Sequence, residues 1–286
     1  KTSPYIVDVW AQPAVPSLAE RVPEVKVLNA RSSTSMFSQN LPPKGLSPQD
    51  TIKLMDKGMT RVALMSAWNR PQTEVISNEV VASFVEAAPD RFAGLCSVDL
   101  ADPVQACKDL EYWVREKGFK GLRVVPWLWD KPPNANLYYP LFVKCIELDV
   151  PFCTQVGHTG PLRGSEVGRP IPYLDEVALT FPKLKIVGGH VGFPWTNEMI
   201  GLAWKYDNVY IDTSAYTPKA YPMELVQFMG TLGADKVLFG TNFPMITWEK
   251  CHKQLGDLGL SPKVLDKFTH LNAEKVFKLN PQPPKL

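Results

Sequence analysis

The chain has 286 residues, 45% of them hydrophobic, and a formal net charge of +2 at pH 7. This size suits one large domain, and a near-neutral charge without a long Lys/Arg run argues against a nucleic-acid partner. No apolar stretch reaches the roughly 18 residues of a membrane span. Five cysteines, an odd number without a CxxC pair, favour reduced thiols and a cytoplasmic protein.

Eight short apolar runs rich in β-branched residues are spaced along the chain as strands would be. Two of them, Arg61–Met65 and Lys185–Gly189, are almost continuously hydrophobic, which suits parallel strands covered on both faces. In chain order the runs begin near Tyr5, Arg61, Phe92, Gly121, Pro151, Lys185, Val209 and Lys236.

Helical patterns lie between these runs. The clearest, Pro103–Lys117, spaces its apolar residues three and four apart, starts with proline and is followed by Gly118 as a C-cap. Eight strands that alternate with helices predict an α/β fold, a (β/α)₈ TIM barrel in a single domain over residues 1–286. A doubly wound open sheet is the alternative, although no glycine-rich dinucleotide fingerprint follows any strand. The other helical patterns are Val75–Ala88, Pro140–Leu148, Tyr173–Phe181 and Tyr221–Leu232.

One connection is much longer than an ordinary strand-to-helix loop. Residues 13–48 are rich in Pro, Ser, Asn and Gln and leave the carboxyl end of the first strand. That end of a TIM barrel is the face on which active sites lie. The segment is therefore a lid over the mouth, a contact in a homodimer, or a surface excursion.

Polar residues at strand ends are the candidates for chemistry. In the first strand, Asp8, Trp10 and Gln12 alternate and are expected on one face, the barrel interior. Asp8 is either structural or an acid/base with a shifted pKa. His158 and His190 each follow a glycine at a strand end, where a histidine either transfers protons near neutral pH or makes a structural hydrogen bond.

Other residues point to ligand binding. Arg123, in the fourth strand, would hold a carboxylate through its planar guanidinium or pair with an interior acid. Asp212 either reaches the pocket or belongs to a structural turn, and Arg163 and Arg169 either guard the mouth or are solvated. Several tryptophans that follow strand-like runs predict an aromatic-lined pocket: Trp10, Trp68, Trp127, Trp129 and Trp195.

Several motifs together resemble one known family. They occur in order at strand ends and extend over essentially the whole chain: Val156–Arg163, Gly168–Ala178, Val187–Trp195, Val209–Ser214, Leu238–Pro244 and Leu271–Phe277. In these motifs the chain resembles the amidohydrolase-related group of the amidohydrolase superfamily. That group includes aminocarboxymuconate-semialdehyde decarboxylase, resorcylate-type decarboxylases and pyrone-dicarboxylate lactonase. The resemblance implies a (β/α)₈ barrel.

The resemblance also implies where a metal would bind, and there the chain departs from the pattern. The family's first strand carries His-x-His, or Glu for the first His, and its eighth strand ends in an aspartate. Here these positions are Trp10, Gln12 and Asn242, whereas the histidines after the fifth and sixth strands are retained as His158 and His190. Tryptophan has no lone pair to offer and neutral amide oxygens bind zinc weakly, so we predict no metal and no cofactor.

The resemblance and these residues together predict an enzyme of this group, a hydrolase or carbon–carbon lyase with a metal-free site, that acts on a small aromatic or unsaturated carboxylic acid. The reaction would be decarboxylation, lactone opening or hydration/dehydration. His158 and His190 would transfer protons and Asn242 and Gln12 would bind an oxyanion. Two alternatives are a catalytically silent barrel that binds a small ligand or serves as a scaffold, and a metal enzyme with unusual ligands. The remaining candidates are Asp8 as a catalytic residue, and Trp10, Arg123, Trp127 and Trp195 as substrate-binding residues.

Overall fold

The computed structural model of the protein describes residues 5–31 and 42–280. All eight expected barrel strands are present, and each begins within one residue of the expected position. Their bounds are β1 Ile6–Ala11, β2 Thr60–Ser66, β5 Phe92–Leu95, β6 Leu122–Val124, β7 Phe152–Gln155, β8 Ile186–Gly189, β9 Val209–Asp212 and β10 Val237–Leu238.

The strands close into a ring. They form two parallel sheets, in the orders β1-β2-β5 and β10-β9-β8-β7-β6, and hydrogen bonds join both pairs of edges. At one junction the Val9 amide donates to the Phe239 carbonyl at 3.0 Å and the Asn242 amide donates to the Trp10 carbonyl at 2.8 Å. At the other, the Cys96 amide donates to the Gly121 carbonyl at 2.9 Å. The predicted (β/α)₈ barrel is therefore confirmed, and the doubly wound alternative is excluded.

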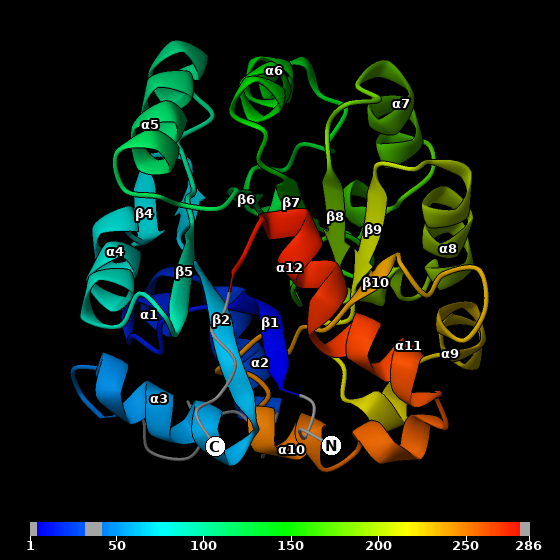
Figure 1. Ribbon diagram of the computed structural model, residues 1–286. Coiled ribbons are helices and arrows are strands. Elements are labelled where there is room, and N and C mark those ends of the chain that lie inside the picture. Colours follow the sequence, from blue (N-terminus) through cyan, green and yellow to red (C-terminus); the bar gives the residue numbers. More distant parts are fainter. Residues whose placement is uncertain (1–4, 32–41, 281–286) are drawn as a thin grey trace.

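Helices surround this ring (Figure 1). In α5 the Asp102 carboxylate accepts hydrogen bonds from the first-turn amides, and the helix buries Ala106, Leu110 and Trp113 on one face. Its C-cap is Glu116, so Gly118 lies two residues beyond, with a φ of +71°. The helices are α3 Pro48–Lys57, α4 Asn78–Ala87, α5 Pro103–Arg115, α6 Tyr139–Leu148, α7 Tyr173–Thr180, α8 Thr196–Lys205 and α9 Met223–Met229.

A short hairpin was not expected from the sequence. Strand β3 (Trp68–Arg70) pairs antiparallel with β4 (Thr73–Ile76) directly after β2. The apolar pair Val75 and Ile76 fits the helical period that follows it, so the sequence places the start of the next helix too early. Helix α4 begins only at Asn78, capped by the Ser77 side chain.

The last helix closes the amino-terminal end of the barrel. Helix α12 (Asn272–Phe277) lies across that end in Figure 1, and its residues Val276 and Phe277 share a buried cluster with Val7 and Val9. Helices α10 (Trp248–His252) and α11 (Pro262–Asp266) precede it. The carboxyl ends of the strands are thus left as the open face. Among the residues that the structure describes, no helix could span a membrane.

Candidate active site

A pocket of about 260 Å³ lies at the carboxyl ends of the strands. It brings together five of the expected site residues, Gln12, Trp127, His158, His190 and Asn242. Asp8, Trp10, Arg123 and Trp195 do not line it. The other lining residues are Leu18, Val25, Leu28, Trp68, Gln155, Thr159, Gly160, Ala215, Tyr216 and Met245.

Two amide side chains meet on the wall of the pocket, at the junction of the first and last strands. Gln12 follows β1, and its Nε2 donates to Oδ1 of Asn242 at 2.9 Å. Asn242 adopts a left-handed backbone conformation with a φ of 66°, which asparagine tolerates better than most residues. The buried Oε1 of Gln12 has no hydrogen-bond partner among the described residues. This pair can therefore offer a polar group to a ligand without bringing a charge.

His190 provides an imidazole in the turn directly after β8. Its Nδ1 lies 2.7 Å from the Ser214 hydroxyl oxygen, and its side chain is almost wholly buried. Burial, aided by the positive charge of Arg123, lowers the pKa of His190 to about 3. The imidazole is therefore neutral at physiological pH, with its second nitrogen free of the Ser214 bond.

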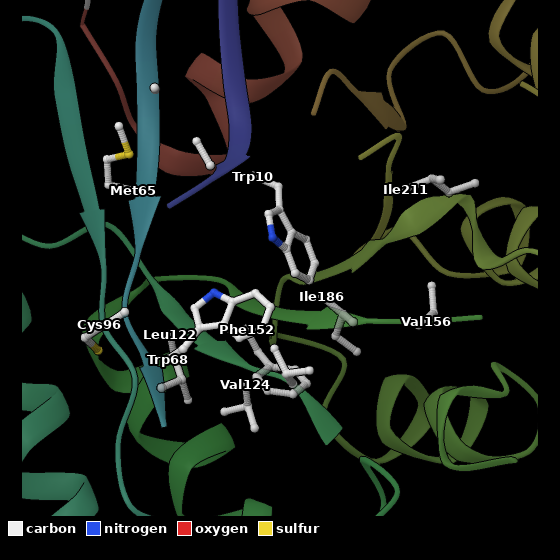
Figure 2. Packing of buried hydrophobic residues seen from close by; sticks show 14 of the residues in the cluster. Trp10, Met65, Trp68, Cys96, Leu122, Val124, Phe152, Val156, Ile186 and Ile211 are labelled. Atoms are coloured by element: carbon white, nitrogen blue, oxygen red, sulfur yellow. The ribbon is translucent and has the colours of Figure 1, made fainter. Parts of the chain in front are cut away.

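Trp10 fills the barrel interior beneath the pocket. Figure 2 shows its side chain projecting from the end of β1 into the space that the strands enclose. The Trp10 and His190 ring centroids are 4.3 Å apart, and the guanidinium carbon of Arg123 lies 3.6 Å from the Trp10 ring centroid. A Cβ atom on Gly189 would come within 2.2 Å of the Trp10 ring, so only glycine leaves room for it.

Arg123 lies below the pocket wall, contrary to the expectation that it meets a ligand. Its side chain on β6 is completely buried, and its Nη2 donates to the Val9 carbonyl at 2.9 Å. Its Nε and Nη1 have no hydrogen-bond partner within the described part of the chain. The guanidinium thus acts on the site as a buried charge under Trp10, and its placement gives no direct contact with a substrate carboxylate.

Asp8 is not part of the pocket either, because the strand register is irregular between Asp8 and Ala11. Its carboxylate accepts hydrogen bonds from the Trp10 and Thr241 amides, from the Thr241 hydroxyl at 2.5 Å and from the Trp248 indole at 2.6 Å. Burial raises the pKa of Asp8 to about 7, although these bonds oppose the rise. Of the two expected roles, this geometry fits the structural one.

The side of the pocket at β7 is held by a chain of hydrogen bonds that the sequence did not reveal. The Trp127 indole donates to Oε1 of Gln155 at 2.9 Å, and Nε2 of Gln155 donates to the His158 carbonyl at 2.6 Å. His158 itself is exposed, with Nδ1 3.0 Å from the Ser165 hydroxyl oxygen. Trp195 lies beside it, 6.3 Å between ring centroids, outside the wall. Gln155 was detectable only as the last polar residue of its strand run.

The long segment after β1 supplies another wall. Leu18 of α1 (Ser17–Arg21) and Val25 and Leu28 of α2 (Pro23–Arg31) line the pocket. Arg163, from the loop after β7, donates to Glu24 of α2 at 2.7 Å and to Asp130 at 2.9 Å. Residues 17–31 are named here the cap. Of the expected segment 13–48, residues 32–41 lie outside the described residues.

The donor set does not fit the divalent metal that the resemblance implies. Trp10 has no donor atom for a cation, and Oδ1 of Asn242 already accepts from Gln12. Of the four ligand positions that the resemblance implies, Trp10, Gln12, His158 and Asn242, only His158 is an imidazole. Across residues 5–31 and 42–280, no group of three or more His, Cys, Asp or Glu side chains is arranged to hold a metal ion.

A parallel barrel with imidazoles and amides in a pocket at the carboxyl ends of its strands has the arrangement of a TIM-barrel enzyme. The family model described as amidohydrolase matches residues 33–279. The chain therefore belongs to the amidohydrolase family, as its motifs predicted.

Individual relatives agree with this assignment. The gamma-resorcylate decarboxylase of Polaromonas sp. (strain JS666) is 26% identical over 286 aligned positions, which cover 80% of this chain and 86% of the relative. An uncharacterized TIM-barrel protein of Bordetella bronchiseptica has a TM-score of 0.81 at 22% identity and covers 96% of this chain and 98% of its own. The 5-carboxyvanillate decarboxylase of Novosphingobium aromaticivorans, solved with manganese and 4-hydroxy-3-methoxy-5-nitrobenzoic acid, has a TM-score of 0.75 at 18% identity and covers 98% of both chains. Enzymes of this family and the decarboxylase relative confirm the expected enzyme class, a hydrolase or carbon–carbon lyase.

Proposed function

We propose that this protein is a carbon–carbon lyase that decarboxylates a small aromatic carboxylic acid without a metal ion. The observation that carries the proposal is the combination of a neutral histidine and an amide pair with aromatic and aliphatic walls in one pocket of about 260 Å³. A pocket of this size suits a single substituted ring. The gamma-resorcylate decarboxylase relative, which acts on such a ring, supports the same reaction class.

The walls favour a flat ligand with a single charge. Trp68, Trp127 and Tyr216 offer ring faces and edges, and Leu18 and Met245 offer aliphatic surface. None of the described residues that line the pocket is a lysine or arginine. Because amides and a neutral imidazole compensate one carboxylate far better than several, an aromatic monocarboxylate is a better substrate than a polycarboxylic acid.

In the proposed reaction, a proton adds to the ring carbon that carries the carboxylate, the bond between ring and carboxylate breaks, and CO₂ leaves. His190 transfers this proton, and Gln12 with Asn242 binds the carboxylate or a neighbouring hydroxyl group. His158, at the exposed rim, is proposed to assist entry or proton exchange with solvent. Asp8 and Arg123 support the site from below and do not touch the substrate.

Metal independence is part of the proposal. Manganese accompanies the Novosphingobium decarboxylase in its solved structure. In this chain, the indole at Trp10 and the paired amides at Gln12 and Asn242 argue for chemistry that runs on proton transfer and hydrogen bonding alone. A cytoplasmic location and a homodimer remain predictions.

The test is turnover of gamma-resorcylate, followed as CO₂ release, in parallel with metal analysis of the purified protein. We expect less than about 0.1 equivalent of Mn, Zn, Fe or Co, turnover that survives EDTA, and at least about a 100-fold loss in the His190→Gln variant. Turnover that disappears with EDTA and returns with Mn²⁺ would overturn metal independence. Binding of gamma-resorcylate and related hydroxybenzoates without any CO₂ release would instead identify a ligand-binding barrel.

A further inference from the structure

We propose that Ser214 and Asp212 form a proton relay with His190, in which the imidazole passes protons between the pocket and a buried carboxylate by changing its tautomer. In this relay Ser214 and Asp212 are positioning residues, because neither lines the pocket and both act through His190. The proton's use in decarboxylation rests on the proposed function, but the relay itself can be tested without turnover.

Three polar groups are aligned from the pocket wall into the barrel. Nδ1 of His190 lies 2.7 Å from the Ser214 hydroxyl oxygen. The Ser214 amide donates to Oδ1 of Asp212 at 2.8 Å. The Ser214 hydroxyl also lies close enough to this carboxylate to lower its pKa. Asp212 ends β9 and Ser214 follows two residues later, so the turn after this strand sets both groups against His190 at the end of β8. Asp212 and Ser214 are completely buried.

Asp212 is poised to exchange a proton because it is only half satisfied. Its Oδ2 is buried and has no hydrogen-bond partner among the described residues. A buried, unpaired carboxylate oxygen is costly, and adding a proton removes the charge. Burial raises the pKa of Asp212 to about 6, although the Arg123 charge and the bonds from Ser214 oppose the rise. Both protonation states are therefore accessible near neutral pH.

The surroundings of Asp212 stabilise the state that the relay leaves behind. Arg123, on β6, attracts the ionised carboxylate, whereas Asp8, on β1, repels it. Cys153 on β7 and Tyr221 face the same interior, with burial raising the pKa of both groups, so they remain neutral. Arg123 does not reach the pocket wall, and we assign its positive charge the role of counter-charge to Asp212.

The proposed step balances as follows. The Nε2–H bond of His190 breaks and a C–H bond forms at the ring carbon that carries the carboxylate. The Ser214 hydroxyl proton moves to Nδ1 of His190, and the Asp212 proton moves to the Ser214 oxygen. The bond between ring and carboxylate then breaks, its electron pair returns to the ring, and CO₂ leaves. Asp212, now a carboxylate, takes up one proton from solvent before the next turnover, which is the proton that decarboxylation consumes.

This relay predicts an unusual titration. When Asp212 is ionised, its carboxylate accepts a hydrogen bond from the Ser214 hydroxyl. The Ser214 oxygen then accepts a hydrogen bond from Nδ1–H of His190, and Nε2 of His190 carries a lone pair. When Asp212 is protonated, the bonds reverse and His190 carries its proton on Nε2. The imidazole changes tautomer as Asp212 titrates, with a midpoint near pH 6, and stays uncharged throughout because the pKa of His190 is lowered to about 3.

The experiment is ¹H–¹⁵N NMR of the full chain labelled with ¹⁵N-histidine, from about pH 4.5 to 8, with the His190 signals assigned by their loss in His190→Gln. We expect an exchange of the protonated nitrogen near pH 6 in the wild type and a single tautomer at all pH values in Asp212→Asn and in Ser214→Ala. Tyr221→Phe is the matched control, since it removes a buried hydroxyl that donates to Thr213 at 2.9 Å outside the relay. The exchange should persist in this control.

The outcomes separate the relay from the proposed function. A single wild-type tautomer over the whole range, an imidazolium that forms near pH 6, or an exchange that persists in both Asp212→Asn and Ser214→Ala would each overturn the relay. Exchange in the wild type without CO₂ release from gamma-resorcylate would leave the relay standing and sink the proposed function. If both hold, Ser214→Ala should lower turnover by about 100-fold and remove its dependence on pH near 6.

Discussion

The carboxylates of Asp8 and Asp212 are equally buried in one barrel, yet their surroundings differ. Asp8, where the first strand meets the last, accepts four hydrogen bonds that occupy both oxygens. Asp212, at the end of β9, accepts a hydrogen bond from the Ser214 amide, and its second oxygen has no hydrogen-bond partner within the described residues. Burial raises the pKa of both groups. The contrast teaches that an unpaired oxygen and a contact through Ser214 with His190, more than depth or pKa, distinguish the carboxylate proposed to exchange a proton from the structural one.

The largest expected effect on stability comes from removing the Asp8 carboxylate, whose oxygens are both hydrogen-bonded. Asp8→Ala leaves the Trp248 indole, the Thr241 hydroxyl and two backbone amides without their acceptor. We expect the free energy of unfolding to fall by at least about 5 kcal/mol, measured by urea denaturation. Asp212→Asn, which removes fewer bonds, should lose less than about 2 kcal/mol. Equal losses in the two variants would contradict the contrast.

Trp10→Ala should have the next largest effect. The variant removes a fully buried ring that packs on both Arg123 and His190. We expect a loss of about 4 kcal/mol in the free energy of unfolding, because the cavity is enclosed by strands that cannot collapse into it. Trp204→Ala is the control, since that ring is 69% exposed, and should change stability by less than about 0.5 kcal/mol. A similar loss in both variants would show that the packing of Trp10 does not contribute to the free energy of unfolding.

The pH dependence of the free energy of unfolding gives a finer test, because His190 and Asp212 should change it in opposite directions. Unfolded His190 takes up a proton near pH 6.5, but folded His190 resists it down to about 3. The wild type should therefore lose stability relative to His190→Gln as the pH falls below 6.5, by up to about 1.4 kcal/mol per pH unit. Asp212 binds its proton more tightly when folded, so the wild type should gain stability relative to Asp212→Asn as the pH falls from about 6 toward 4. Parallel trends in both comparisons would refute the assigned protonation states.

The smallest effect is expected at the rim, where Arg163 joins the cap to the barrel. Arg163→Gln removes the bonds to Glu24 and Asp130 from a partly exposed position and should cost about 1 kcal/mol. If the cap retains the ligand, gamma-resorcylate should dissociate about fivefold faster in stopped-flow measurements, the equivalent of that energy. Arg169→Gln, whose guanidinium pairs with Glu198 away from the cap, is the control and should leave dissociation unchanged.

The sequence was sufficient for the strands and for part of the site. Continuous apolar runs such as Arg61–Met65 belong to buried parallel strands, and their starts could be placed to within one residue. The helical part of residues 13–48 was not recognisable, because α2 has no clear apolar period of its own and is held by contacts with distant loops such as that of Arg163 to Glu24.

The positions of Asp8 and Arg123 relative to the pocket could not be predicted, for a different reason. Simple alternation along β1 would put Asp8 beside Gln12, but the irregular register between Asp8 and Ala11 separates them. The site of Arg123 depends on the ring of Trp10, which comes from a strand more than a hundred positions earlier. The order of residues within each strand does not reveal either contact.

The hydrogen bonds of Asp8 also constrain the order in which this chain can mature on the ribosome. Its partners Thr241 and Trp248 follow it by 233 and 240 positions, and Gln12 meets Asn242 over a separation of 230. While the intervening chain is being translated, the Asp8 carboxylate lacks its donors from Thr241 and Trp248, and the first strand lacks its neighbour at the last strand. Nascent chains stopped before Thr241 should therefore depend on chaperones or aggregate, and the pocket wall that Gln12 and Asn242 share can form only near the end of synthesis.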